Sequence, residues 1–225
     1  MQTQQILKQL KAQSNPRDIA GMARFGINPH NAYGISIPTL RHIARQTGKD
    51  HRLAQELWKS GIHEARILAA LVDEPEQVTA AQMERWVKDF DSWDVCDQVC
   101  SNLFDKTPFA YRQALAWSRR KEEFVKRAGF ALMAALAWHD KAGSDAAFRR
   151  FLPAVKRGAT DERNFVKKAV NWALRQIGKR NRALNRAAIA TAREIQRIDS
   201  SAARWIAADA LRELETKGRR MKDEK

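Results

Sequence analysis

A tryptophan and a carboxylate lie four residues apart in the stretch Asp-Ser-Trp-Asp-Val-Cys-Asp-Gln-Val-Cys, residues 91–100. Residues at this spacing share one face of a helix, so Trp93 and Asp97 can present an aromatic ring and a negative charge side by side. Such a pair can hold a cation, which is attracted both to the charge and to the electron-rich face of the ring. The pair is therefore the first candidate for chemistry in this chain.

The helix that carries this pair has a well-defined start. Asp91 or Ser92 can cap it, and Asp94 lies in its first turn, where negative charge is favourable. Asp97 lies beyond the first turn, so its charge needs another explanation. Either it pairs with an Arg or Lys of the next helix, or it faces a cation that develops on a ligand, with Trp93 shielding the site.

The charge balance of the chain points to a polyanionic partner. The 225 residues include 41 Lys and Arg against 26 Asp and Glu, which gives a formal net charge of +15 and a pI near 10.3. Nucleic acid is the leading partner, although a ribosome or an anionic membrane surface would attract the same charge. With 44% apolar residues, the chain can bury a real core. We expect a single domain over residues 1–217, followed by a charged, disordered tail over residues 218–225.

Membrane and secreted proteins are disfavoured. The longest uninterrupted apolar run, Ala128 to Trp138, is shorter than the roughly 20 residues of a membrane span. The segment from Met1 to Ser14 lacks the apolar core of a signal peptide. Cys96 and Cys100 lie one turn apart on one predicted helix, which suits buried thiols in a reducing compartment better than a disulfide or a zinc site. We expect a cytoplasmic monomer that does not associate with a membrane.

No metal or cofactor motif stands out in the sequence. The five histidines do not form the H-E-x-x-H spacing of a zinc enzyme, and no G-x-S-x-G nucleophile motif occurs. Gly26 and Gly34 do not form a phosphate-binding loop. We therefore expect neither a metal nor a cofactor.

Helical periodicity runs through nearly the whole chain, and no segment alternates with period two for long enough to make a strand. The longest irregular segment spans residues 25–38. Further helices are expected to start at Asn15-Pro16, at Trp93 and at Thr107-Pro108. The remaining helices are predicted over residues 4–13, 39–47, 52–59, 64–72, 80–90, 122–139, 144–156, 162–178, 183–195 and 201–216. The fold is expected to be all-α.

The chain also repeats itself. Phe124-Val125-Lys126-Arg127-Ala128 recurs as Phe165-Val166-Lys167-Lys168-Ala169, and Ala173-Leu174-Arg175 recurs as Ala210-Leu211-Arg212, in each case after about 40 residues. This period is typical of HEAT and armadillo repeats, in which antiparallel helix pairs stack into an α-solenoid. The concave face of a solenoid is an extended binding surface. An irregular helical bundle with chance similarity is the alternative.

Basic residues follow one face of the predicted helix over residues 162–178. Lys168, Trp172, Arg175 and Lys179 recur at helical spacing, away from the apolar stripe. A merely solvated face would mix the two signs, so we expect phosphate contacts here and a basic concave face. Trp172 could instead pack at a helix junction, as most tryptophans do. The predicted DNA-contacting residues are Lys126, Arg163, Lys167, Lys168, Arg175, Lys179 and Arg180.

Three motifs together resemble a known family. Trp93-Asp94-Val95-Cys96-Asp97, Lys126-Arg127-Ala128 and Ala169-Val170-Asn171-Trp172-Ala173-Leu174-Arg175 occur in this order on the second helices of successive repeats. They look like the corresponding segments of the AlkD-type DNA alkylation repair proteins, which are DNA glycosylases built from HEAT-like repeats. The resemblance covers roughly residues 34–214 and is strongest from Trp93 to Lys179.

The resemblance implies a role for each matching residue. Asp97 would be the catalytic carboxylate, Trp93 and Trp172 would be aromatic walls against the deoxyribose and backbone of the lesion, and Arg127 would contact a phosphate beside it. The implied substrate is double-stranded DNA carrying cationic N3- or N7-alkylated purines, such as 3-methyladenine and 7-methylguanine. The family is also unusual in cutting without turning the base into a pocket.

Two functions remain open at this point. The first is a glycosylase of base excision repair, which hydrolyses the N-glycosidic bond of a cationic alkylpurine. The second is a protein without catalysis, either a binder of distorted or branched DNA or a HEAT-repeat scaffold for an acidic partner. Release of modified base would favour the first, and binding that ignores the lesion and falls steeply with salt would favour the second.

Overall fold

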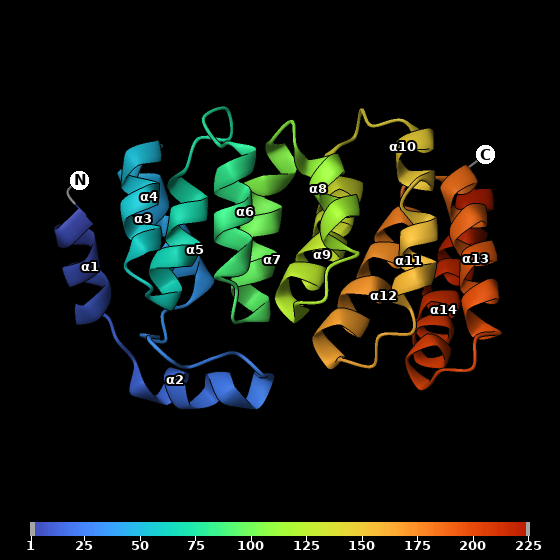
Figure 1. The fold of residues 1–225 in the computed structure, drawn as a ribbon, viewed down its shortest axis with the longest axis horizontal. Coiled ribbons are helices and arrows are strands. Elements are labelled where there is room, and N and C mark those ends of the chain that lie inside the picture. The colour runs from blue at the N-terminus through green and yellow to red at the C-terminus, as the bar shows by residue number, and fades with distance from the viewer. Residues whose placement is uncertain (1–2, 224–225) are drawn as a thin grey trace. The chain divides into compact units, whose positions relative to one another are not determined.

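This computed structural model describes residues 3–223, with side chains for residues 3–218 (Figure 1). The regular elements among these residues are all helices, which confirms the predicted all-α fold. Short turns join successive helices into stacked antiparallel pairs, as the repeat period predicts. The chain forms two compact units, Met1–Thr107 and Pro108–Lys225.

Helix α5 is the centre of the first unit, because it packs against α3, α4 and α7. Eight of its ten residues are buried. Trp58 and Trp86 stack with ring centroids 4.0 Å apart and join α4 to α6. The helices of this unit are α1 (Thr3–Ala12), α2 (Pro16–Met22), η1 (Ala23–Phe25), α3 (Ile37–Thr47), α4 (His51–Lys59), α5 (His63–Val72), α6 (Ala80–Lys88), α7 (Trp93–Asn102) and η2 (Phe104–Lys106).

A buried carboxylate ties the irregular segment before α3 to helix α5. Glu64 is only 1% exposed, and it accepts hydrogen bonds from the backbone N–H groups of Tyr33, Gly34 and Ile35. Gly34 adopts a φ of +71°, and a Cβ atom there would lie 3.0 Å from the backbone nitrogen of Ile19. The buried Glu64 carboxylate and the close approach of Gly34 to the backbone of Ile19 therefore hold this segment in place.

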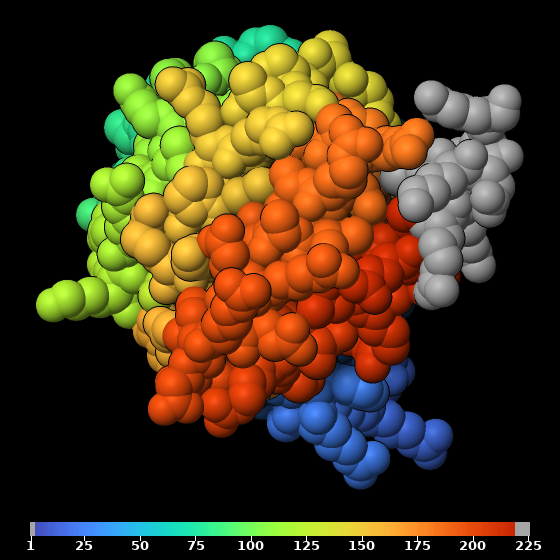
Figure 2. Space-filling model, turned by 90° about the vertical axis from the view of Figure 1, so that its right-hand side faces the viewer, coloured from blue at the N-terminus to red at the C-terminus, as the bar shows by residue number. Residues whose placement is uncertain are grey.

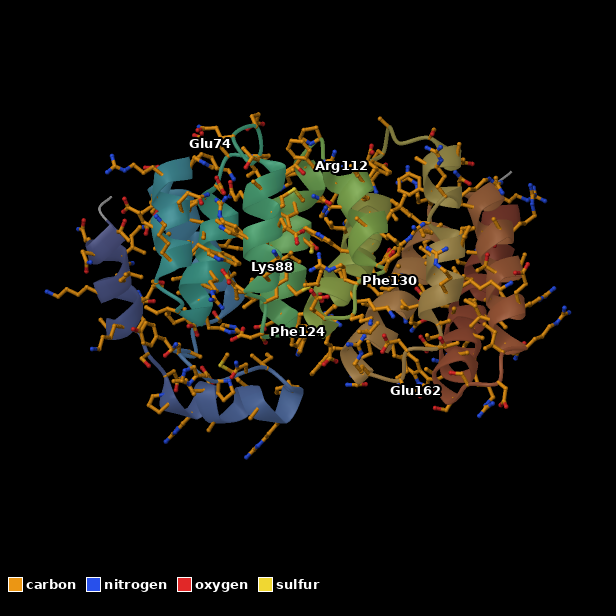
Figure 3. The ribbon with its side chains drawn as sticks, in the orientation of Figure 1. Glu74, Lys88, Arg112, Phe124, Phe130 and Glu162 are labelled. Carbon is orange, nitrogen blue, oxygen red and sulfur yellow. The ribbon has the colours of Figure 1, made fainter. Side chains whose placement is uncertain are left out.

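The second unit is built around α9 and α12, which pack along each other. Phe130 of α9 is fully buried and points into this core (Figure 3). The other helices cover the pair, with α8 against α9, and α11, α13 and α14 against α12. The helices of this unit are α8 (Ala110–Trp117), α9 (Glu123–His139), α10 (Asp145–Arg149), α11 (Leu152–Gly158), α12 (Asn164–Gly178), α13 (Arg182–Gln196) and α14 (Ser201–Asp223).

A row of polar contacts holds α14 against α12. Arg175 of α12 donates a hydrogen bond to Asp209 at 2.8 Å and forms an ion pair with Glu213 at 2.7 Å. Lys179 donates to Glu213 at 2.8 Å. Asn171, one turn before Arg175, donates to Asp209 at 2.7 Å. Burial raises the pKa of Asp209, but these donors outweigh it and lower the pKa below its ordinary value. We call these five residues the α12–α14 ladder.

Two helix predictions are wrong. Thr107-Pro108 does not start a helix, because Thr107 instead closes η2, with its hydroxyl donating to Phe104 O, and α8 starts at Ala110. The helix predicted over residues 144–156 is split into α10 and α11. Pro153 is the physical reason, because it lacks the N–H that a continuous helix needs and is tolerated only in the first turn of α11.

The last helix is longer than predicted. It was expected to end near Thr216, but the backbone of α14 is helical through Asp223. The described part of the chain excludes residues 224–225 and the side chains of residues 219–223. The charged, disordered tail over residues 218–225 therefore stays a prediction. The single-domain boundary at residues 1–217 also stays a prediction.

At Gly129, helix α9 lies close against the backbone at the end of α8. A Cβ atom at Gly129 would collide with the backbone nitrogen of Ser118 and lie 2.9 Å from Ala114 O. Gly129→Ala must therefore push two backbones apart, and we expect it to lower the free energy of unfolding by about 2 kcal/mol or more. Urea titration followed by circular dichroism measures this change.

Gly21→Ala is the matched control, because a Cβ atom at Gly21 on α2 meets nothing within 4 Å. This replacement should leave stability unchanged or raise it by about 0.5 kcal/mol, since alanine restricts the unfolded chain. Equal effects of the two replacements would contradict the close approach at Gly129.

Candidate functional site

Helix α7 carries the Trp93–Asp97 pair, as predicted. It starts at Trp93, with Ser92 in the N-cap position. The Ser92 hydroxyl does not cap the helix backbone but donates to the Asp94 carboxylate at 2.6 Å. Trp93 and Asp97 are both half-buried, one helical turn apart. A ring and a carboxylate of the first unit therefore lie on one helix face.

A buried hydrogen bond anchors the first turn of α7. His63 Nε2 lies 2.8 Å from the Asp94 carboxylate, and the His63 side chain is 4% exposed. Burial lowers the pKa of His63, but the hydrogen bond and the charge of Asp94 outweigh it, so the pKa lies above its ordinary value of 6.5. Burial raises the pKa of Asp94, but its bonds to His63 and Ser92 outweigh this and lower it. Asp94 thus anchors the helix.

The N-terminal segment also contacts this helix, which the sequence did not predict. The indole nitrogen of Trp93 donates to the carbonyl oxygen of Phe25 at 3.0 Å. Asn28 donates its side-chain amide to Asp91 at 2.9 Å and its backbone N–H to Ser92 at 3.3 Å. The Phe25 side chain is 74% exposed. No local pattern relates residues this far apart in the chain, so only the folded chain could reveal the contact.

The neighbouring acidic residues have structural partners. Asp89 accepts a hydrogen bond from the Trp58 indole at 2.8 Å. Asp91 bonds to Asn28, and Asp94 to His63. Each of these three carboxylates therefore has a structural role.

The two cysteines are buried on the face of α7 that points away from solvent, and they form no disulfide. Burial raises the pKa of the Cys100 thiol well above its ordinary value, and the neighbouring Cys96 adds to this effect. A thiol in this environment stays protonated and is a poor nucleophile. Both cysteines are therefore packing residues, as predicted.

The other two residues of the predicted site belong to the second unit. Arg127 on α9 is only 5% exposed, and its guanidinium donates to the backbone oxygen of Phe165 at 2.6 Å. Phe165 lies in the first turn of α12. Trp172 lies two turns further along α12 and is half-buried. Phe165, Lys168 and Trp172 follow helical spacing along one face of this helix.

Most of the predicted DNA-contacting cations have partners within the protein. Lys126 and Arg163 both bind Asp161, at 2.8 and 2.7 Å, and these donors lower the pKa of Asp161 far below its ordinary value against the opposing effect of burial. Arg180 donates to Ala137 O and Gly143 O. The cations engaged in this way are Lys126, Arg163, Arg175, Lys179 and Arg180.

Two of the predicted cations differ from these. Lys168 is exposed and has no hydrogen bond or ion pair among the described side chains. Lys167 places its ammonium 5.3 Å from the ring centroid of Trp205. The even basic track expected along α12 is thus partly neutralised, because α14 supplies acidic partners. A basic concave face stays a prediction.

Comparison with known proteins identifies the family. The family model described as DNA alkylation repair enzyme matches residues 6–214, which is nearly the whole chain. The chain belongs to the DNA alkylation repair enzyme family. The resemblance seen in the sequence is therefore confirmed.

Two relatives of this family member are informative. A solved structure described as "A new family of proteins related to the HEAT-like repeat DNA glycosylases with affinity for branched DNA structures" has a TM-score of 0.78 at 20% identity, covering 94% of this chain and 95% of that one. It shows that the fold is of the HEAT-like repeat type. The uncharacterized protein Lin0241 of Listeria innocua serovar 6a is 28% identical over 130 residues, which are 56% of this chain and 58% of that protein.

Two further findings concern metals and membranes. Within the described part of the chain, no three His, Cys, Asp or Glu side chains gather into a possible metal site. None of the described helices is long and apolar enough to cross a bilayer.

The His63–Asp94 pair predicts a pH dependence of stability in this family member. The pKa of His63 is raised in the folded state, so the pair stabilises the fold fully below the unfolded pKa near 6.5. This contribution is lost as the pH rises above 6.5 through the folded pKa of His63. The free energy of unfolding should therefore fall over that range, as measured by urea titration at several pH values.

Asp94→Asn keeps the shape of the pair but removes the charge that raises the pKa of His63. It should lower stability at the acidic end of that range and abolish the decline with pH. His63→Gln should abolish the decline as well. A decline of the same size in wild type and Asp94→Asn would rule out this pair as its source.

Proposed function

We propose that this protein is a DNA glycosylase of base excision repair, which hydrolyses the N-glycosidic bond of cationic N3- or N7-alkylated purines in double-stranded DNA. The single observation that carries the proposal is the Trp93–Asp97 pair on α7, with both side chains half-buried on a helix whose first turn is anchored by His63. Membership of the DNA alkylation repair enzyme family supports the choice of substrate.

The chemistry of the substrate fits one carboxylate. An alkylated purine already carries a positive charge and leaves readily as a neutral base, so positive charge develops on the deoxyribose as the bond to the base breaks. The carboxylate of Asp97 would stabilise this oxocarbenium-like sugar and orient the water that adds to its C1′ atom. A preorganised charge does this without rearranging at the moment of reaction. The Trp93 ring would face the same cation and exclude bulk water.

The residues of the second unit would act on the DNA backbone. Trp172 is assigned the second aromatic wall, and Lys168 beside it a phosphate contact. Arg127 is assigned the phosphate next to the lesion, with its guanidinium oriented by Phe165 O. Backbone contacts of this kind position the DNA, while the lesion is selected by its charge.

A binder without catalysis is the second candidate. The similar solved structure is described as belonging to a family with affinity for branched DNA structures, and at 20% identity it shares only the fold with this chain. Under this alternative the same surfaces would bind distorted DNA, and Asp97 would have no chemical role. The two candidates differ in one observable, the release of modified base.

Replacing the carboxylate tests the first candidate. Asp97→Asn keeps the size and polarity of the side chain but removes its charge, and it should slow release of 7-methylguanine from duplex DNA by at least about 100-fold. Alkali cleavage at the abasic sites formed in a single turnover measures the rate. Asp91→Asn, an exposed carboxylate just before the same helix, is the control and should keep most of the activity.

The outcomes separate the candidates clearly. Equal slow release by wild type and Asp97→Asn would exclude catalysis by this carboxylate. Release by neither protein, combined with tight binding to distorted DNA, would favour the binder.

The exposed and the ion-paired cations of α12 should contribute differently to the salt dependence of DNA binding. Lys168→Ala removes an exposed charge, so it should lower the slope of log affinity against log salt by about 0.9. Lys179→Ala should change the slope less, because Lys179 must first leave Glu213 before it can contact a phosphate. Fluorescence anisotropy with duplex DNA over a range of salt concentrations measures both slopes. Equal changes would show that the ladder opens on binding.

A further inference from the structure

Trp205 is an exposed tryptophan on the second turn of α14. Its side chain is 41% exposed, whereas its neighbours Ala203 and Ile206 are fully buried. The helix therefore does not need the indole for its core. Lys167 of α12 places its ammonium 5.3 Å from the ring centroid, close enough for a cation–π contact. Lys168, the next residue, is exposed.

The structure holds this ring firmly relative to α12. The α12–α14 ladder lies one and two turns further along both helices, so it fixes the spacing of the two helices. At the other end, Glu162 accepts hydrogen bonds from Ser200, Ser201 and the backbone of Ala202 at the start of α14 (Figure 3). Trp205 lies between these two anchored points. A ring held this way loses little freedom when it binds a ligand.

The local charge favours an anionic partner. Two carboxylates of this region are already engaged, since Glu162 accepts hydrogen bonds at the start of α14 and Asp199 binds Arg204 at 3.1 Å. Lys167 forms no ion pair among the described side chains, although its charge helps to lower the pKa of Glu162. Helices α13 and α14 form much of the face seen in Figure 2, where they lie side by side. The surface around Trp205 thus combines an accessible indole with the ammonium group of Lys167.

An indole beside a cation fits a nucleobase attached to phosphate, because the ring stacks on the base and the cation contacts the backbone. In an intact duplex, both faces of every internal base are already stacked on neighbouring bases. The ring can therefore stack fully only on a base that has left the duplex. We propose that Trp205, with the ammonium of Lys167 against its ring, is a stacking platform for an unpaired nucleotide of DNA.

The proposal goes beyond the excision chemistry and rests on the proposed function only in taking DNA as the partner. It assigns to this chain a preference for duplexes that carry a flap or a gap, located at one residue of the second unit. It requires no role for Asp97. A protein without glycosylase activity could therefore have the platform, and an active glycosylase could lack it.

Trp138 offers a matched control within the same unit. It is 58% exposed at the C-terminal end of α9, and Lys141 lies 5.2 Å from its ring centroid. The pair thus repeats the chemistry of Trp205 and Lys167 at another place. There, however, the adjacent Arg180 is committed to Ala137 O and Gly143 O. Loss of Trp138 removes an indole that is even more exposed, without changing the platform.

The experiment compares affinities by fluorescence anisotropy for an undamaged duplex and for the same duplex with a short single-stranded flap. Trp205→Ala should weaken binding to the flap DNA by about 5- to 30-fold, the effect of losing one stacked base, and leave duplex binding nearly unchanged. Trp205→Phe should restore most of the preference, because it keeps an aromatic face. Trp138→Ala should behave like wild type. The salt slope should be the same for wild type and Trp205→Ala, since no charge is removed.

Three results would overturn the platform. Equal losses on flap and duplex DNA would assign Trp205 to general binding or folding, and circular dichroism of the variant distinguishes these. Equal losses in Trp138→Ala and Trp205→Ala would show that any exposed indole suffices. No loss in Trp205→Ala would remove the ring from DNA binding. Release of 7-methylguanine from unbranched duplex is measured in parallel and should be unaffected by Trp205→Ala, so a failure of the glycosylase proposal is recognised separately.

Discussion

The buried hydrogen bond between His63 and Asp94 is the contact on which the candidate carboxylate depends. It joins the first turns of α5 and α7, and so sets the direction in which Trp93 and Asp97 leave the helix. A hydrogen bond between a histidine and a carboxylate in a buried environment is strong, and leaving either partner unpaired is costly. The Trp93 indole is held in addition by Phe25 O. The site helix is therefore fixed by groups that take no part in chemistry.

The second unit shows how a strongly basic chain limits the repulsion among its Lys and Arg side chains. The acidic residues are few, but they are placed where helices of neighbouring repeats meet. Asp161 binds Lys126 and Arg163, and the carboxylates of α14 bind the cations of α12. Net charge is thus a reliable guide to the class of partner but a poor guide to the residues that touch it. The cations left for a polyanion are those without such a partner, such as Lys168.

The proposed reaction needs little from the protein beyond a fixed negative charge next to the deoxyribose of the lesion. The substrate brings its own positive charge and a good leaving group, so a single carboxylate beside an aromatic ring can supply the remaining stabilisation. A repeat fold suits this task, because its second helices form a rigid series on which single side chains can be presented. The platform proposed at Trp205 would use the same series for a different purpose, the recognition of unpaired bases.

The sequence by itself determined the all-α fold, the helix pairs and the Trp93–Asp97 pair, because helical periodicity, capping residues and i, i+4 spacing are local properties of the chain. It also determined that the cysteines are packing residues. Only the tertiary structure decided which cations are paired, that Phe25 contacts Trp93, and that Trp205 is exposed beside Lys167. The reason is physical: a partner from another repeat is set by how two helices pack, and no residue-type pattern along one helix records the side chain that will lie opposite it.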